Sequence, residues 1–158
     1  MKRRCRSWLV SVLVGGLCLP MAVLAADELP GLHIENAWIR AMPPGQRNTA
    51  AYLSATNHGQ ETVTIVGAST DLAAKAEMHR SREVDGYMRM EQLDAVPVPA
   101  GSSVHLTPGG IHLMLLGLNA MPEEGSTALL CLQLSTGRTV CIDAVVQKSG
   151  QGGHQHQH

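Results

Sequence analysis

Short runs of β-branched and aliphatic residues recur from residue 32 to residue 146, and Gly, Pro, Asn or Asp separates each run from the next. No run shows the 3.6-residue spacing of an amphipathic helix, so the pattern predicts an all-β domain. Residues 71–77 are ambiguous, because they could equally form one helical turn. Many short strands at this spacing are typical of an antiparallel sandwich or barrel. The predicted strands are 33–41, 49–57, 61–69, 73–81, 86–93, 102–107, 111–117, 127–135 and 138–147.

The strongest hairpin signal is the Asp-Gly pair at residues 85–86. With this pair as a two-residue loop, His79 opposes Gln92 and Ser81 opposes Met90. His79 and Met90 are then diagonal neighbours on one face, with backbones about 7 Å apart. Two long side chains at that separation can reach a shared ion.

A second His-Met pair follows a predicted type II turn at Pro108-Gly109. Strand alternation puts His112 and Met114 on one face and Leu113 on the other. The two pairs together are candidate ligands for a single metal ion. For any one of these residues the alternative is ordinary packing, since Met in a strand is usually core filler.

The types of ligand in this set select the metal. Two imidazoles and two thioethers carry no negative charge to offset a divalent cation, and thioether sulfur prefers Cu(I). We therefore expect His79, Met90, His112 and Met114 to bind Cu(I). A blue-copper electron carrier would need a cysteine ligand close to a His and a Met, which this chain lacks. Nothing in the sequence indicates a substrate cleft, so we do not expect an enzyme.

The N-terminal residues predict export. Four of the first six residues are basic, and an almost wholly apolar stretch follows. This is the pattern of a secretory signal peptide, residues 1–26, cleaved after Ala25 or Ala26. A retained membrane anchor is disfavoured because the apolar run is short for a span. Cys18 does not make a lipobox, because Leu17 stands where a small residue is required. We expect a periplasmic protein that is not an integral membrane protein once processed.

Charge and length constrain the mature chain. Eight basic and thirteen acidic residues remain after removal of residues 1–26, a net charge of −5 with His neutral. Nucleic acid is therefore not an expected partner. Residues 27–148 suffice for one domain with a real core. The tail, residues 149–158, cannot bury anything, so we expect it to be disordered and to bind a borderline divalent metal weakly; the alternative is a tail that is simply solvated. The histidines of that tail are His154, His156 and His158.

The two cysteines of the mature chain flank a predicted hairpin turn. A two-residue loop would place Cys131 and Cys141 on opposite faces, whereas a three-residue loop would place them opposite each other. A disulfide and two small buried residues both remain open.

The chain resembles the PCuAC family of periplasmic Cu(I) chaperones. Its motif is a His, ten residues, a Met, twenty-one residues and then His-x-Met, and the spacing from His79 to Met114 matches it without a gap. Flanking segments are similar too, among them the Ala-Trp-Ile-Arg sequence at residues 37–40 and Leu-Thr-Pro-Gly-Gly at residues 106–110.

This resemblance implies a cupredoxin-like antiparallel β-sandwich with Greek-key connections. It also implies a Cu(I) chaperone that delivers copper toward the copper centre of cytochrome c oxidase. The implied partners are the copper-site subunit of that oxidase and thioredoxin-fold assembly proteins. The alternative is a copper buffer or resistance protein without a dedicated acceptor. C-terminal Met- and His-rich tails in the family are associated with an additional Cu(II) site, and the tail here has His but no Met. The sequence leaves the oligomeric state open.

Overall fold

The structure, a computed structural model, describes residues 31–148 of the 158-residue chain. The predicted signal peptide and the predicted His-rich tail lie outside these residues. Within the described range there are ten strands and no helix, and hence no helix able to cross a membrane. The strands are β1 (Leu32–Arg40), β2 (Asn48–Asn57), β3 (Val63–Thr70), β4 (Ala73–Val84), β5 (Tyr87–Gln92), β6 (Val96–Val98), β7 (Ser103–Leu106), β8 (Ile111–Leu118), β9 (Thr127–Leu134) and β10 (Thr139–Gln147).

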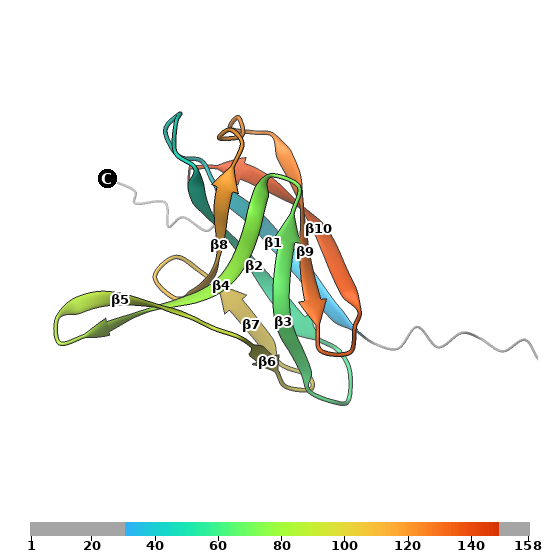
Figure 1. Cartoon of the computed structure of the whole chain (residues 1–158). Coiled ribbons are helices and arrows are strands. Elements are labelled where there is room, and N and C mark those ends of the chain that lie inside the picture. The colour runs from blue at the N-terminus through green and yellow to red at the C-terminus, as the bar shows by residue number, and fades with distance from the viewer. Residues whose placement is uncertain (1–30, 149–158) are drawn as a thin grey trace, which may run out of the picture.

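Seven of these strands form a closed barrel. The order around it is β4, β8, β2, β1, β10, β9 and β3, and the pairing of Ala68 with Ala76 closes the ring between β3 and β4. Strands β5, β6 and β7 pair on the outside of this order, with β4, β3 and β2. Figure 1 shows the barrel and the β4–β5 hairpin, which projects from it as a two-stranded arm. The all-β prediction is confirmed.

The predicted strand at 73–81 is confirmed, and the alternative of a helical turn at 71–77 is wrong, because β4 begins at Ala73 and continues to Val84. The short strand β6 was not predicted; it has three residues and contains Pro97. Proline is tolerated there because β6 is the last strand on its side of the sheet. The described strand pairs are antiparallel except for β1 with β10, which run parallel.

The core explains which side chains face outward. Leu113 and Leu115 of β8 are fully buried in the apolar core, as is Ala51 of β2. Because side chains alternate along a strand, His112 and Met114 point to the outer face of the barrel. Tyr52 of β2 lies on the same outer side. His112 and Met114 therefore lie on the outside of the barrel wall and not in its interior.

The predicted hairpin register is confirmed. Asp85 and Gly86 both have positive φ, 54° and 79°, as a type I′ turn requires. His79 pairs with Gln92, and Ser81 pairs with Met90.

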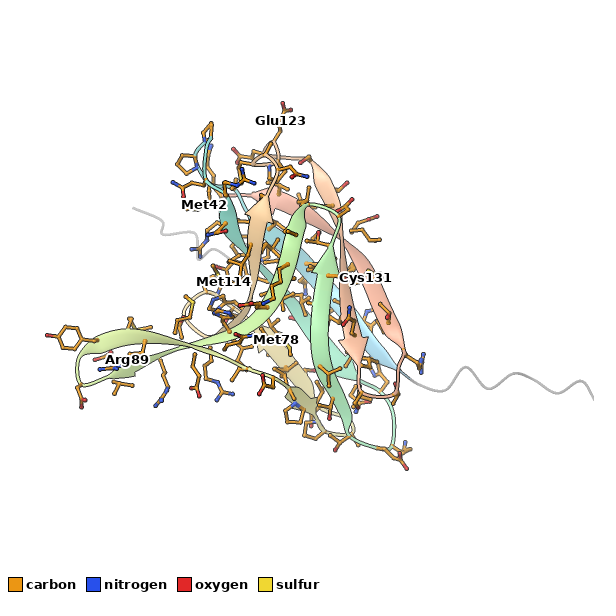
Figure 2. All side chains as sticks on the ribbon, viewed as in Figure 1. Met42, Met78, Arg89, Met114, Glu123 and Cys131 are labelled. Atoms are coloured by element: carbon orange, nitrogen blue, oxygen red, sulfur yellow. A yellow bond between two sulfur atoms is a disulfide. The ribbon has the colours of Figure 1, made fainter. Side chains whose placement is uncertain are left out.

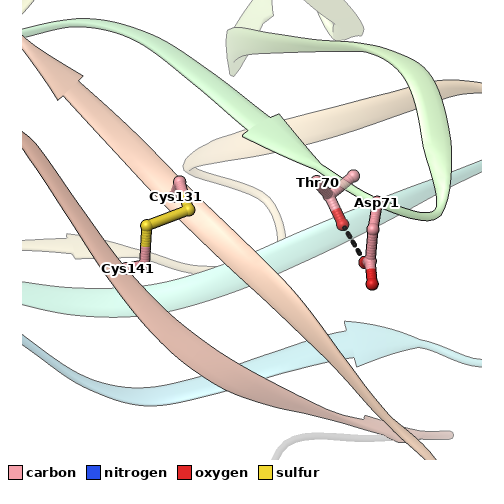
Figure 3. The surroundings of a disulfide bond; sticks show 4 residues. All are labelled: Thr70, Asp71, Cys131 and Cys141. Carbon is pink, nitrogen blue, oxygen red and sulfur yellow. Dashed lines mark hydrogen bonds between the residues drawn. A yellow bond between two sulfur atoms is a disulfide. The ribbon is translucent and has the colours of Figure 1, made fainter.

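The structure also decides between the alternatives for the cysteines. Cys131 and Cys141 pair directly across β9 and β10 and form a disulfide (Figure 3). The loop between the strands has three residues and ends at Gly137, whose φ is 83°. Neighbouring positions Leu130, Leu132 and Ala144 are in the core, so the disulfide lies on the outer face.

Replacing both cysteines with alanine is expected to lower the free energy of unfolding by about 2–3 kcal/mol, because the cross-link restricts a short loop of the unfolded chain. Urea unfolding of the oxidised protein and of the double variant would measure this. Cu(I) affinity should not change, since β3 separates β4 from β9 and two strands separate β8 from β10. An unchanged unfolding midpoint would show that the cross-link does not stabilise the fold.

Candidate metal centre

His79 and His112 face each other across two adjacent strands. They are directly paired residues of β4 and β8. Their ring centroids are 6.1 Å apart, and the ring planes are inclined by 51°. This pairing brings the two predicted His-Met pairs, which lie far apart in the sequence, onto the neighbouring strands β5, β4 and β8.

The His112 ring is fixed by the turn that precedes its strand. The Gly110 carbonyl accepts a hydrogen bond from His112 Nδ1 at 3.0 Å and another from the Ser81 backbone N–H at 3.0 Å. A carbonyl only accepts, so Nδ1 carries the proton and the lone pair of Nε2 remains for a metal ion. Gly109 has a φ of 80°, consistent with the predicted type II turn. His112 itself is only 4% exposed.

His79 is oriented by a carboxylate. Its Nε2 lies 2.8 Å from Glu77 Oε2, and Lys75 Nζ contacts the other oxygen of the same carboxylate. The hydrogen bonds from Lys75 and then from His79 hold the pKa of Glu77 below its ordinary value, so Glu77 is ionised at neutral pH. An ionised carboxylate only accepts, so His79 donates from Nε2.

The other nitrogen of His79 has no partner. Nδ1 is buried and makes no hydrogen bond. A buried polar atom without a partner is costly in a folded protein. A metal ion bound at this lone pair would remove that cost, so the ring fits a ligand role. Both histidines thus have one nitrogen anchored to oxygen and one lone pair free, the arrangement usual for metal-ligating histidines.

The two candidate sulfur ligands lie on either side of this pair. Met114 is half-buried on β8, directly opposite Glu77. Met90 is 55% exposed on the arm, two residues from the partner of His79. In Figure 2, Met114 lies on the barrel wall where the arm leaves it. Met78, by contrast, is 4% exposed and belongs to the core.

An aromatic cluster borders the site. The Tyr52 ring lies 6.4 Å from the His112 ring, and Trp38 stacks on Tyr52 at 4.3 Å. The Arg40 guanidinium lies 5.2 Å from the Tyr52 ring centroid. Burial raises the pKa of the Tyr52 phenol, so it stays neutral. Tyr52 is 3% exposed, so this side of His112 is packed, whereas Met90 on the arm is exposed.

The remaining described histidines lie elsewhere. His105 Nδ1 is 3.0 Å from Ser54 Oγ, and His33 and His58 pack near each other at 6.1 Å. Within residues 31–148 no three His, Cys, Asp or Glu side chains come together in a metal-binding arrangement. Methionine sulfur beside the two imidazoles would favour Cu(I) over harder ions. The predicted Cu(II) ligands His154, His156 and His158 lie outside the described residues.

Sequence reasoning missed Glu77 and Tyr52 as parts of this site. Glu77 could have been found, because it precedes His79 by two residues and so shares its strand face. Tyr52 could not, because its proximity depends on the pairing of β2 with β8.

Replacing Glu77 with Gln is expected to weaken Cu(I) binding about tenfold, because the neutral amide orients and polarises the His79 ring less well than a carboxylate. Anaerobic competition against a chromogenic Cu(I) chelator would measure the affinity. Glu83→Gln is the matched control, since Glu83 lies on the same face of β4 but further along the arm. An equal loss in both variants would mean that net charge, not contact with His79, sets the affinity.

Comparison with known proteins agrees with this architecture. The solution structure of CuI-DR1885 from Deinococcus radiodurans is 32% identical, with a TM-score of 0.62, over 79% of this chain and 83% of that one. The copper-bound PCuAC domain from PmoF2 has a TM-score of 0.63 over 75% of this chain and 94% of that one; at 24% identity it supports the fold alone. The resemblance to PCuAC domains is thus confirmed for the fold.

Sequence relatives point in the same direction. A protein of Leifsonia xyli subsp. xyli (strain CTCB07), named "Putative lipoprotein Lxx21020", is 34% identical over 129 residues, which cover 81% of this chain and 76% of that protein. Residues 32–146 match the family described as "Putative lipoprotein LpqE-like". The chain therefore belongs to the LpqE-like family, and its barrel has the fold of a PCuAC domain.

Proposed function

We propose that this protein is an extracytoplasmic copper chaperone that carries one Cu(I) ion on His79, Met90, His112 and Met114. The observation that carries this proposal is the His79–His112 pair, in which each ring has one nitrogen anchored and one lone pair free. The 32% identity to a protein whose structure is of a Cu(I) form supports the choice of metal.

The arrangement suits a carrier better than an enzyme. Neutral imidazoles and thioethers hold Cu(I) without a thiolate, so an incoming thiolate of an acceptor can displace them one at a time. A cavity of about 840 Å³ lies between the loops at residues 41–47 and 119–124 and contains none of the four ligands. This cavity is therefore separate from the proposed copper site.

Destination, location and the finer fold class are further parts of the proposal. We expect delivery toward the copper centre of cytochrome c oxidase, together with thioredoxin-fold assembly proteins, on a cupredoxin-like scaffold. The lipoprotein name of the Leifsonia relative supports export, here through cleavage after Ala25 or Ala26 into the periplasm. The tail histidines His154, His156 and His158 would capture Cu(II).

The test is an anaerobic titration of the chain from residue 27 with Cu(I) against a chromogenic Cu(I) chelator. One tight equivalent is expected, and Zn(II) should not compete for it. Absence of a tight equivalent would contradict the proposal. Transfer of the bound ion to an acceptor with a pair of thiols would separate a chaperone from a copper buffer, which would retain it.

A further inference from the structure

The β4–β5 arm carries more sulfur than the four-ligand site uses. Strand β5 is the edge strand beyond β4, and all six of its residues are exposed. In Figure 1 the arm extends away from the barrel, and no other strand covers it. Packing in the core therefore does not explain which side chains occur on β5.

The two faces of the arm differ in chemistry. The pairs His79–Gln92, Ser81–Met90 and Glu83–Met88 share one face, because directly paired residues point the same way. The other face is charged and includes Arg82, which contacts Glu91 at 3.4 Å, and Arg89. Methionine sulfur is thus confined to the face that begins at the copper site.

Met88 is the outer member of this row. It is 64% exposed, against 55% for Met90. Two residues along a strand separate their backbones by about 6.6 Å, a gap that two long thioether side chains can close around one ion. An unbranched, polarisable side chain in this position is able to bind a soft ion as well as to contact a protein surface.

We infer that Met88 is an exchange ligand through which Cu(I) reaches and leaves the four-ligand site. This inference rests on the proposed function and extends it to the route of transfer. As a Cu–S bond to Met88 forms beside that of Met90, the bonds from the ion to His112 and Met114 on β8 break. The ion remains Cu(I) throughout, and every ligand in the exchange is neutral, so no electron or proton has to be supplied. The ion then rests on the exposed arm, where an acceptor can bind it.

The matched test compares Met88→Leu with Met42→Leu, an exposed methionine in the loop after β1. Leucine retains apolar bulk and removes sulfur, so it separates coordination from apolar docking. Met88→Leu is expected to leave Cu(I) affinity within about twofold and to slow transfer to a chromogenic chelator about fivefold or more, with Met42→Leu unchanged in both.

Two further readouts do not depend on transfer. In methyl NMR of the chain from residue 27, Cu(I) alone should shift the Met88 ε-methyl signal as well as that of Met90. In a Met90→Leu background, adding Met88→Leu should weaken Cu(I) binding about tenfold more, because Met88 replaces the missing sulfur there.

Equal transfer rates for Met88→Leu and Met42→Leu, or a Met88 methyl signal that does not respond to Cu(I), would overturn the inference. If the wild-type chain binds one tight Cu(I) that depends on Met114 and either of these results is found, only the route is wrong. If the wild-type chain binds no tight Cu(I), the proposed function fails as well.

Discussion

Replacing Met114 with leucine is expected to weaken Cu(I) binding by about a hundredfold or more, equivalent to about 3 kcal/mol. Met114 is half-buried on the outer wall of β8, on the same strand face as His112, so its side chain has little freedom to lose when it binds an ion. Leucine has nearly the same volume, so the barrel should fold normally and the loss should report coordination alone. Competition titration under anaerobic conditions would measure the change.

Met78→Leu is the control that makes this result specific. Met78 directly precedes His79 in the sequence, yet it is 4% exposed and packs in the core on the other side of β4. Its substitution is expected to leave Cu(I) affinity unchanged within about twofold, with a small loss of stability. If both variants lost affinity equally, the effect would come from the fold, and the outward face of β4 and β8 would not be the copper site.

Local chemistry made part of this site predictable from the sequence. An Asp-Gly turn admits few geometries, so residues 85–86 fixed the register that puts His79 and Met90 on one face. Strand alternation likewise placed His112 and Met114 together. Both inferences span fewer than about fifteen residues. Over that range, the turn type and the alternation of side chains along a strand determine which residues share a face.

The sequence alone did not predict which strands pair when they are far apart along the chain. Nothing in residues 73–84 or 111–118 specifies that β4 lies beside β8 with His79 opposite His112. The closure of the barrel through Ala68 and Ala76 could not be predicted either, because a single pair of small residues has no sequence signature. Such contacts depend on how the whole set of apolar faces is buried together, and they determine which neighbours, such as Tyr52, complete the site.

Whether the two cysteines form a disulfide was also not predictable from the sequence, although they are only ten residues apart. The sequence could not choose between a two-residue and a three-residue loop, and that choice decides whether Cys131 and Cys141 meet. The three-residue loop, whose last residue Gly137 has a positive φ, resolves it. In Figure 2, Cys131 lies on a wall of the barrel apart from Met114, so the disulfide is separate from the candidate copper ligands.

Cu(I) binding is expected to raise the melting temperature of the barrel by about 20 °C at a free Cu(I) concentration about a thousandfold above the dissociation constant. At that ratio the free energy of unfolding increases by about 4 kcal/mol. For a domain of this size, each kcal/mol shifts the midpoint by about 4–6 °C. The effect requires that the folded state alone holds the ion, and the proposed ligands come from three strands, β4, β5 and β8.

Thermal unfolding by circular dichroism, with Cu(I) buffered by a chelator, would measure this shift in the wild-type chain and in Met114→Leu. The variant is expected to lose most of the shift, because a hundredfold weaker site retains only about 1.4 kcal/mol of linkage at the same free Cu(I). Zn(II) is the matched ion control and should produce little shift, since neutral thioethers bind it poorly. A rise of equal size with Zn(II), or in the variant, would mean that the stabilising ion is held by nitrogen and oxygen atoms alone, and that the methionines at the junction of barrel and arm serve packing.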